Sequence, residues 1–89
     1  MSFDLDYTNR FKKDVKICLK RNYNIALLEA VLLELREKGE LPLKYKSHLL
    51  SGNKDGLWEC HIKPDWLMTW YFDKTTIVLV RTGTHSDLF

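Results

Sequence analysis

Three short apolar segments in the last third of the chain place the strongest constraint on the fold. They span residues 58–62, 66–72 and 76–82, and aromatic and β-branched side chains typical of strands dominate them. The first connection is Lys63, Pro64 and Asp65, and the second turns at Asp73 and Lys74. Connections this short join antiparallel neighbours, because parallel strands need a crossover of a dozen or more residues. The sequence therefore predicts an antiparallel meander.

The N-terminal half predicts one strand and two helices. Residues 3–7 alternate apolar and acidic side chains, which is the period of a half-buried edge strand. Thr8 can cap a helix that runs to about residue 22, with apolar positions at 11, 15, 18 and 19 on one face. Asn24 can cap a second helix from residue 25 to about residue 38, and Gly39 suits its left-handed end.

The second helix is apolar over much of its circumference, so we expect it to pack against both the first helix and a sheet. Residues 40–56 show no sustained period and contain proline and two glycines, which favours a long loop. A chain of 89 residues with 45% hydrophobic and 29% charged residues fits one globular domain, here residues 1–89. The expected class is α+β, with two N-terminal helices on a twisted, mainly antiparallel sheet of about four strands.

The composition also indicates the state of the cysteines and the cellular compartment. Cys18 and Cys60 are too few and too far apart for a disulfide framework or a paired metal motif, so we expect two reduced core thiols. The N-terminus lacks a secretion signal pattern, and the longest apolar run, residues 25–35, is interrupted by Glu29 and Glu34. We expect a soluble, cytoplasmic protein without a membrane partner.

A basic stripe marks the first predicted helix. Lys12, Lys16 and Lys20 stack at a spacing of four residues, and only Asp14 offsets the cations around them. Like charges at this spacing destabilise an isolated helix slightly. Two interpretations stay open: a solvated surface, or a face that meets a polyanion such as RNA.

All three histidines lie in or beside the last third of the chain. His61 shares a strand face with Leu57 and Glu59 and points away from the apolar side chains on the other face. Arg81 ends the last predicted strand, and His85 follows shortly after it. We therefore expect these polar side chains to lie on adjacent strands.

These residues carry a family resemblance. The segments LPLKYKSHLLSG, GLWECHIKPDWLMTW and RTGTHSDLF resemble the YafQ branch of the RelE/ParE superfamily of bacterial toxins, and the likeness covers essentially the whole chain. The resemblance implies a RelE-like fold and a ribosome-dependent mRNA endonuclease without a cofactor or metal. It also implies the toxin half of a type II toxin–antitoxin pair, in which an antitoxin covers the basic surface and blocks the site.

Position by position, the resemblance implies a set of site residues. The catalytic candidates are His48, His61, Asp65, Arg81 and His85. The substrate-binding candidates are Trp66, Phe89 and the stripe of Lys12, Lys16 and Lys20. Duller interpretations stay open for single residues: Asp65 as the end of a hairpin, Trp66 as a core residue, and Phe89 as a frayed end or a core plug.

RNA cleavage without a metal needs a base for the 2′-hydroxyl, an acid for the 5′-oxygen and a cation for the phosphorane. We expect His85 to be the acid and Arg81 to be the cation, because a guanidinium can bind two phosphate oxygens at once. Either Asp65, or His61 oriented by Asp65, is the base. His48 positions the phosphate or shares the base role, and Phe89 stacks on a base of the message.

Two rival functions belong to other classes. One is a metal-binding module built from the histidines with Asp65 or Cys60, which is disfavoured because Cys60 and His61 should project to opposite strand faces. The other is a non-catalytic inhibitor or binding toxin, as in the ParE branch. This function would give no role to the histidines, Asp65 and Arg81.

Overall fold

The computed structural model describes residues 2–50 and 56–89. The elements in chain order are β1 (Asp4–Tyr7), α1 (Asn9–Lys20), α2 (Ile25–Lys38), the 3₁₀ turn η1 (Leu43–Tyr45), β2 (His48–Leu49), β3 (Trp58–Lys63), β4 (Trp66–Asp73), β5 (Thr76–Gly83) and α3 (His85–Leu88). The strands form one sheet in the order β1-β5-β4-β3-β2, in which only the β1–β5 pair is parallel. This confirms the α+β fold and the meander, with five strands instead of about four.

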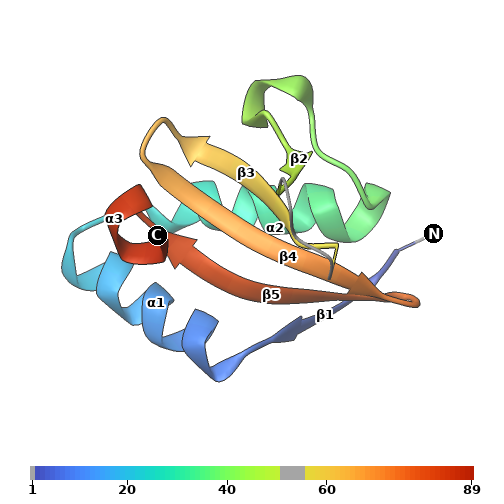
Figure 1. Ribbon diagram of the computed structural model, residues 1–89, viewed down its shortest axis with the longest axis horizontal. Helices are drawn as coiled ribbons and strands as arrows, with labels where there is room; N and C mark the ends of the chain where they lie inside the picture. Colours follow the sequence, from blue (N-terminus) through green and yellow to red (C-terminus); the bar gives the residue numbers. More distant parts are fainter. Residues whose placement is uncertain (1, 51–55) are drawn as a thin grey trace.

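Figure 1 shows the arrangement of the two long helices around the sheet. α2 crosses behind the strands, and α1 lies beside β5, next to the edge that β1 forms. The buried side chains between the helices and the sheet form the core; they are Phe11, Cys18, Leu28, Val31, Leu35, Cys60, Trp66, Met68, Trp70, Ile77 and Leu79. Leu19 and Leu33 were expected on the apolar faces of the helices, but both are exposed. Each helix position turns by about 100°. Leu19 is one position from the buried Cys18, and Leu33 is two positions from both Val31 and Leu35, so both side chains point to solvent.

Three of the four predicted helix ends are confirmed. The Thr8 hydroxyl accepts a hydrogen bond from the backbone N–H of Phe11 (3.0 Å), and the Asn24 side chain accepts one from Ala26 (3.1 Å). Gly39 ends α2 with a φ of 72°, and a Cβ there would lie 2.6 Å from the ring of Phe3. α1 ends at Lys20, two residues before the predicted end.

The face of the sheet away from the core carries a row of residues across four strands. His48 pairs with Glu59, Glu59 with Thr69, and Thr69 with Arg81. Cross-strand partners share a face, so β2, β3, β4 and β5 each contribute one of these residues. A bulge at Val80 makes this possible, because Trp70 pairs with Leu79 while Thr69 pairs with Arg81. Without the extra residue, Arg81 would share the core face with Leu79.

The predicted loop of residues 40–56 contains regular structure. It holds η1 and the two-residue strand β2, which pairs with β3 and brings His48 onto the sheet. Residues 51–55 lie outside the described residues. Among the helices that are described, none has both the length and the apolar character needed to cross a membrane.

Candidate active site

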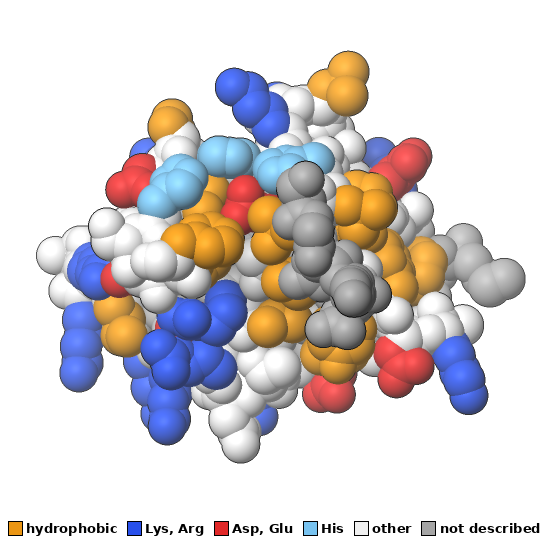
Figure 2. Space-filling view, viewed as in Figure 1, with side chains coloured by type: hydrophobic (Ala, Val, Ile, Leu, Met, Phe, Trp, Pro, Cys, Tyr) orange, Lys and Arg blue, Asp and Glu red, His pale blue; other side chains and the backbone are white. Residues whose placement is uncertain are grey.

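The three histidines lie in a continuous row. The ring centroids of His48 and His61 are 6.4 Å apart, and those of His61 and His85 are 5.9 Å apart. Figure 2 shows the row as neighbouring pale-blue side chains along the upper rim of this face. The histidines come from β2, β3 and α3, so the fold joins residues that are up to 37 positions apart in the sequence (85 minus 48).

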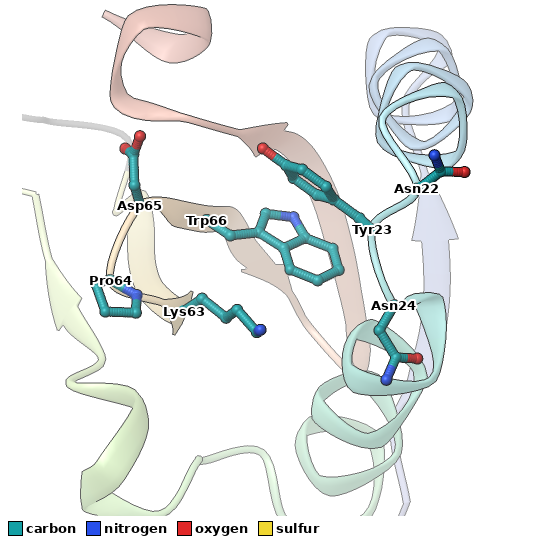
Figure 3. Close-up of a pocket in the computed structure, with 7 residues that line it drawn as sticks. All are labelled: Asn22, Tyr23, Asn24, Lys63, Pro64, Asp65 and Trp66. Atoms are coloured by element: carbon teal, nitrogen blue, oxygen red, sulfur yellow. The ribbon is translucent and has the colours of Figure 1, made fainter.

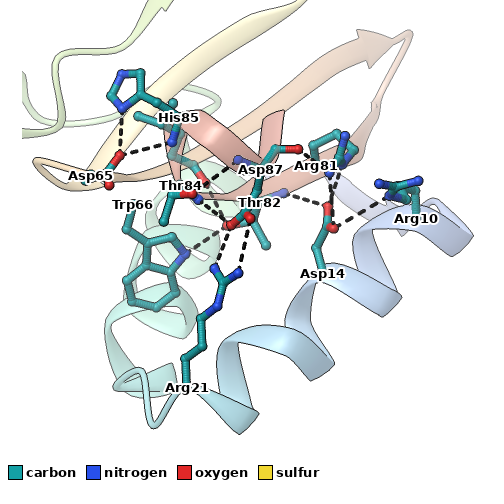
Figure 4. A network of polar contacts seen from close by, with 11 residues as sticks. Arg10, Asp14, Arg21, Asp65, Trp66, Arg81, Thr82, Thr84, His85 and Asp87 are labelled. Atoms are coloured by element: carbon teal, nitrogen blue, oxygen red, sulfur yellow. Dashed lines mark hydrogen bonds and ion pairs between the residues drawn. The ribbon is translucent and has the colours of Figure 1, made fainter. Parts of the chain in front are cut away.

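Asp65 holds His85 at one end of the row. Oδ1 of Asp65 lies 2.7 Å from Nδ1 of His85 and accepts a second hydrogen bond from the backbone N–H of His85 at 3.0 Å (Figure 4). The backbone N–H, followed by the ring, lowers the pKa of Asp65 below its ordinary value. An ionised carboxylate only accepts hydrogen bonds, so Nδ1 of His85 carries a proton and Nε2 is left for substrate.

His61 has a different support. Its Nδ1 lies 3.3 Å from the carbonyl oxygen of Pro64, which only accepts, so this nitrogen donates and Nε2 is free. The prediction that Asp65 orients His61 is therefore wrong: the tight β3–β4 turn directs the Asp65 carboxylate to His85 and the Pro64 carbonyl to His61.

His48 closes the row at its other end. Its Nδ1 lies 2.9 Å from the carbonyl oxygen of Lys46, and its Nε2 lies 3.4 Å from Oε1 of Glu59. Glu59 is only 6% exposed, and its Oε2 has no hydrogen-bond partner among the described residues. Sequence reasoning placed Glu59 on the same face as His61 but gave it no role. The sequence did contain a signal: Glu59 is two residues from His61, and this spacing places both side chains on one face of the strand.

Arg81 lies near the row but is already engaged. Its Nε donates to Oδ2 of Asp14 at 2.7 Å, and its Nη2 faces Oδ1 of Asp14 at 3.4 Å and the carbonyl oxygen of Asp87 at 3.1 Å. Asp14 is 4% exposed and also accepts from the backbone N–H of Thr82. The Nε–Nη2 edge thus neutralises a buried carboxylate, and the role of Arg81 as the cation for the phosphorane stays a prediction.

The short helix α3 is fixed by a group of polar contacts (Figure 4). Thr84 and Asp87 form a capping box, and both oxygens of Asp87 accept from Arg21, at 2.6 and 3.1 Å. The Arg21 guanidinium, followed by the backbone N–H of Thr84, holds the pKa of Asp87 far below its ordinary value. Gly83 has a φ of 152°, and a Cβ there would lie 2.7 Å from Asp87. Sequence reasoning missed this anchor, although the order Thr-His-Ser-Asp is a capping-box spacing.

A basic hollow adjoins His61. It has a volume of about 380 Å³, and its lining includes Lys44, Lys46 and Lys63. Lys12 and Lys16 instead line an apolar hollow between α1 and α2, and Lys20 is exposed in the last turn of α1. Lys12 and Lys16 therefore do not line the hollow beside the histidines, and RNA contact of the predicted stripe stays a prediction.

The two aromatic candidates differ in exposure. Trp66 is 3% exposed, and its indole N–H donates to the hydroxyl of Thr82 at 3.0 Å, so it is mainly a core residue. Phe89 is 73% exposed directly after α3, and its ring is available for contact with a ligand. Trp70 is buried and Trp58 half-buried, and their rings stack with an interplanar angle of 14°.

Both cysteines are buried and free. Burial raises the pKa of Cys18, and it raises the pKa of Cys60 to about 12, so neither thiol is suited to act as a thiolate near neutral pH. Within residues 2–50 and 56–89, no three His, Cys, Asp or Glu side chains are grouped closely enough to hold a metal ion.

Fold and site together define a small α+β protein with a five-stranded sheet and a row of three histidines, one of them paired with Asp65. Residues 3–89 match the family model of YafQ, described as the bacterial toxin of a type II toxin–antitoxin system. The chain therefore belongs to the YafQ family of toxins.

Known relatives agree over nearly the whole chain. The mRNA interferase toxin YafQ of Escherichia coli K12 is 33% identical over 87 residues, which cover 97% of this chain and 95% of the relative. The E. coli DinJ–YafQ toxin–antitoxin complex contains a similar chain, with a TM-score of 0.91, 32% identity and coverage of 100% and 99%. A metal-bound toxin from Helicobacter pylori has a TM-score of 0.91 and 38% identity, with coverage of 98% and 99%.

Proposed function

We propose that this toxin is an endoribonuclease that cleaves mRNA on the ribosome in the cytoplasm and that an antitoxin inhibits it. The family membership and the named activity of the E. coli relative support the reaction class. The observation that carries the mechanism is the pair of His61 and His85, whose rings are 5.9 Å apart and whose Nδ1 atoms are both tied to acceptors. Two Nε2 atoms thus remain on neighbouring rings for two proton transfers.

In this mechanism His61 is the base and His85 is the acid. Nε2 of His61 removes the proton of the 2′-hydroxyl, whose oxygen attacks the adjacent phosphorus. Nε2–H of His85 then protonates the departing 5′-oxygen. The lowered pKa of Asp65 makes its carboxylate a weak base, so Asp65 instead stabilises the protonated ring of His85. The products are a 5′-hydroxyl and a 2′,3′-cyclic phosphate, or the 3′-phosphate derived from it.

Cations near the row support the developing charge. Lys44, Lys46 and Lys63 line the hollow at His61, where they can attract the phosphates of the message. Arg81 contributes its positive charge and holds α3 through the carbonyl oxygen of Asp87. The exposed ring of Phe89 is placed to stack on a base, as aromatic side chains do with single-stranded RNA.

The acid–base pair needs no cofactor or metal for either proton transfer. Cleavage should therefore survive exhaustive EDTA treatment of the purified toxin, provided that the ribosomes receive their magnesium afterwards. A loss of cleavage that zinc or copper restores would favour a metal-assisted reaction. The name of the H. pylori structure makes this control worthwhile.

The antitoxin partner rests on the family and on the E. coli complex with DinJ. We expect a small neighbouring gene whose product carries an acidic segment complementary to the lysines of the toxin. Co-expression of that product should restore growth and abolish cleavage. If no neighbouring product binds the toxin, this part of the proposal is wrong.

The deciding experiment compares wild type with His85→Ala during brief induction in bacteria. Sequencing of transcript 5′ ends should show new ends inside coding regions for wild type, and about 100-fold fewer for His85→Ala, because a general acid contributes about that much or more. Ser86→Ala is the matched control, since Ser86 is exposed in the same short helix. A His85→Ala protein that stays fully toxic without cutting RNA would favour the ParE-like inhibitor.

A further inference from the structure

A second hollow lies on the other side of the β3–β4 turn. It has a volume of about 460 Å³ and separates the α1–α2 connection from the turn. Its lining comes from both segments, and Figure 3 shows these residues around it: Asn22, Tyr23, Asn24, Lys63, Pro64, Asp65 and Trp66. Of these residues, Asp65 supports His85 in the proposed mechanism and Lys63 also lines the basic hollow beside His61; the others have no role in it.

The inner wall of the hollow is aromatic. The rings of Tyr23 and Trp66 lie 4.9 Å apart, centroid to centroid, with a tilt of 59°. The Trp66 indole is 3% exposed and its N–H is bonded to Thr82, so it backs the half-buried Tyr23, which is the ring that a ligand can reach. A flat, aromatic ligand can contact such a wall with its face or edge.

The rim of the hollow is polar. The Asn24 side-chain oxygen accepts from Ala26, and no acceptor for its NH₂ group is present among the described residues. In Figure 3 the Lys63 side chain extends beside the indole of Trp66 from the opposite wall, and the Asn22 amide points away from the rings. An amide and a cation beside an aromatic ring suit a nucleobase and its phosphate better than they suit a purely apolar side chain.

Asp65 connects this hollow to the site of cleavage. It lines the hollow and its Oδ1 lies 2.7 Å from Nδ1 of His85. The hollow and the Asp65–His85 pair thus share one side chain, so a nucleotide held in the hollow would lie next to that pair.

We propose that this hollow is a nucleobase-binding subsite for the nucleotide beside the cleaved bond. The inference rests on the proposed endoribonuclease function and adds a site of substrate selection to it. Tyr23 supplies the aromatic surface for the base, and the buried Trp66 holds its ring in place. The NH₂ group of Asn24 at the rim reads the edge of the base.

The first test removes the aromatic ring. Tyr23→Leu keeps an apolar side chain but removes the aromatic ring. Tyr7→Leu is the matched control, because Tyr7 in β1 also packs on an aromatic ring but lies outside this hollow. Each variant is induced briefly in bacteria, and sequencing of transcript 5′ ends gives the number of cuts. Tyr23→Leu should reduce cuts about fivefold at all sites, the change that corresponds to about 1 kcal/mol of lost stacking. Tyr7→Leu should not.

The second test changes the rim without disturbing the helix. Asn24→Ser keeps an oxygen that can cap α2 but removes the amide NH₂, and Asn9→Ser is the control in α1. Asn24→Ser should flatten the base preference at one position next to the cut. Thermal melting of both proteins checks that they fold equally well.

The outcomes separate the two proposals. If wild type produces no new 5′ ends, the endoribonuclease function fails, and the subsite fails with it. If wild type cuts but Tyr23→Leu and Asn24→Ser reproduce both its number of cuts and its base profile, the subsite alone is overturned. Fewer cuts with Tyr23→Leu and a flatter profile with Asn24→Ser would establish it.

Discussion

The two ends of the histidine row are built differently. His85 lies in α3, which receives charged contacts from three other parts of the chain: Asp65 in the β3–β4 turn, Arg21 after α1 and Arg81 in β5. His48 lies in a two-residue strand, and its contacts are one carbonyl oxygen and Glu59 at 3.4 Å. The row is thus firmly held by ion pairs at one end and lightly held at the other.

This difference fits a division of labour between acid and base. A carboxylate beside His85 stabilises a protonated ring, which is the form that a general acid needs. The carbonyl oxygen beside His61 fixes the proton on Nδ1 without adding charge, and this leaves Nε2 as a neutral base. The comparison teaches that electrostatic support should matter most at the His85 end. Four predictions test this, from the largest expected effect to the smallest.

Arg81→Met should have the largest effect on stability. It leaves the buried carboxylate of Asp14 without its main cation, and the free energy of unfolding should fall by about 3 kcal/mol. Urea unfolding measures the change. Arg10→Met is the matched control, because Arg10 contacts the same carboxylate at 3.7 Å from an exposed position and should cost less than about 1 kcal/mol. Equal losses for the two variants would contradict the structural role of Arg81.

Asp65→Asn should reduce cleavage about tenfold or more without unfolding the protein. The amide oxygen can still accept a hydrogen bond, but it cannot stabilise a positive charge on His85. Single-turnover cleavage of ribosome-bound message across pH 5 to 9 measures the effect, and the profile should change shape as well as height. Asp73→Asn, in the β4–β5 hairpin, is the control. An unchanged pH profile would show that Asp65 does not act through the ring.

The Arg21–Asp87 pair should make stability depend on acid pH. The pKa of Asp87 is depressed in the folded protein, so its contribution is present above the unfolded value of about 3.9 and is lost as the pH falls through the folded value. Asp87→Asn should therefore lower stability by about 1 kcal/mol at pH 7. The difference between the two proteins should shrink below about pH 4. Urea unfolding at pH 7 and pH 3 measures both; a constant difference would exclude the ionised pair as the cause.

Glu59→Gln should have the smallest effect. It removes the charge next to His48 and leaves the shape of the side chain, and cleavage should change by less than about threefold. The same single-turnover assay measures it beside Asp65→Asn. If Glu59→Gln lost as much activity as Asp65→Asn, the two ends of the row would be equally dependent on charge.

The sequence was sufficient for the elements whose causes are local. Thr8 and Asn24 begin the two long helices and Gly39 ends the second, as their side chains and backbone conformations predict. Short turns at Pro64 and Lys74 made the antiparallel meander predictable, and strand parity placed His61 away from the core. These signals depend on only a few neighbouring residues, so they can be recognised in the sequence without knowledge of the fold.

The contacts that shape the site act over longer distances. Arg81 and Asp14 are 67 positions apart. The bulge at Val80 directs Arg81 to the other face of the sheet, and the alternation of side chains in the sequence does not reveal it. Two acidic residues near His61 were available as partners, and only the folded turn assigns Asp65 to His85. Parallel pairing of β1 with β5 likewise depends on how α1 and α2 return the chain to the sheet.

The position of β5 within the sheet has a consequence for the life of the protein in the cell. β5 is the last strand to be synthesised, yet it lies between β1 and β4. A growing polypeptide that has not yet delivered residues 76–83 cannot join its first strand to the rest, and the histidine that follows them has no place to dock. The complete histidine row can therefore form only when nearly the whole chain has been made.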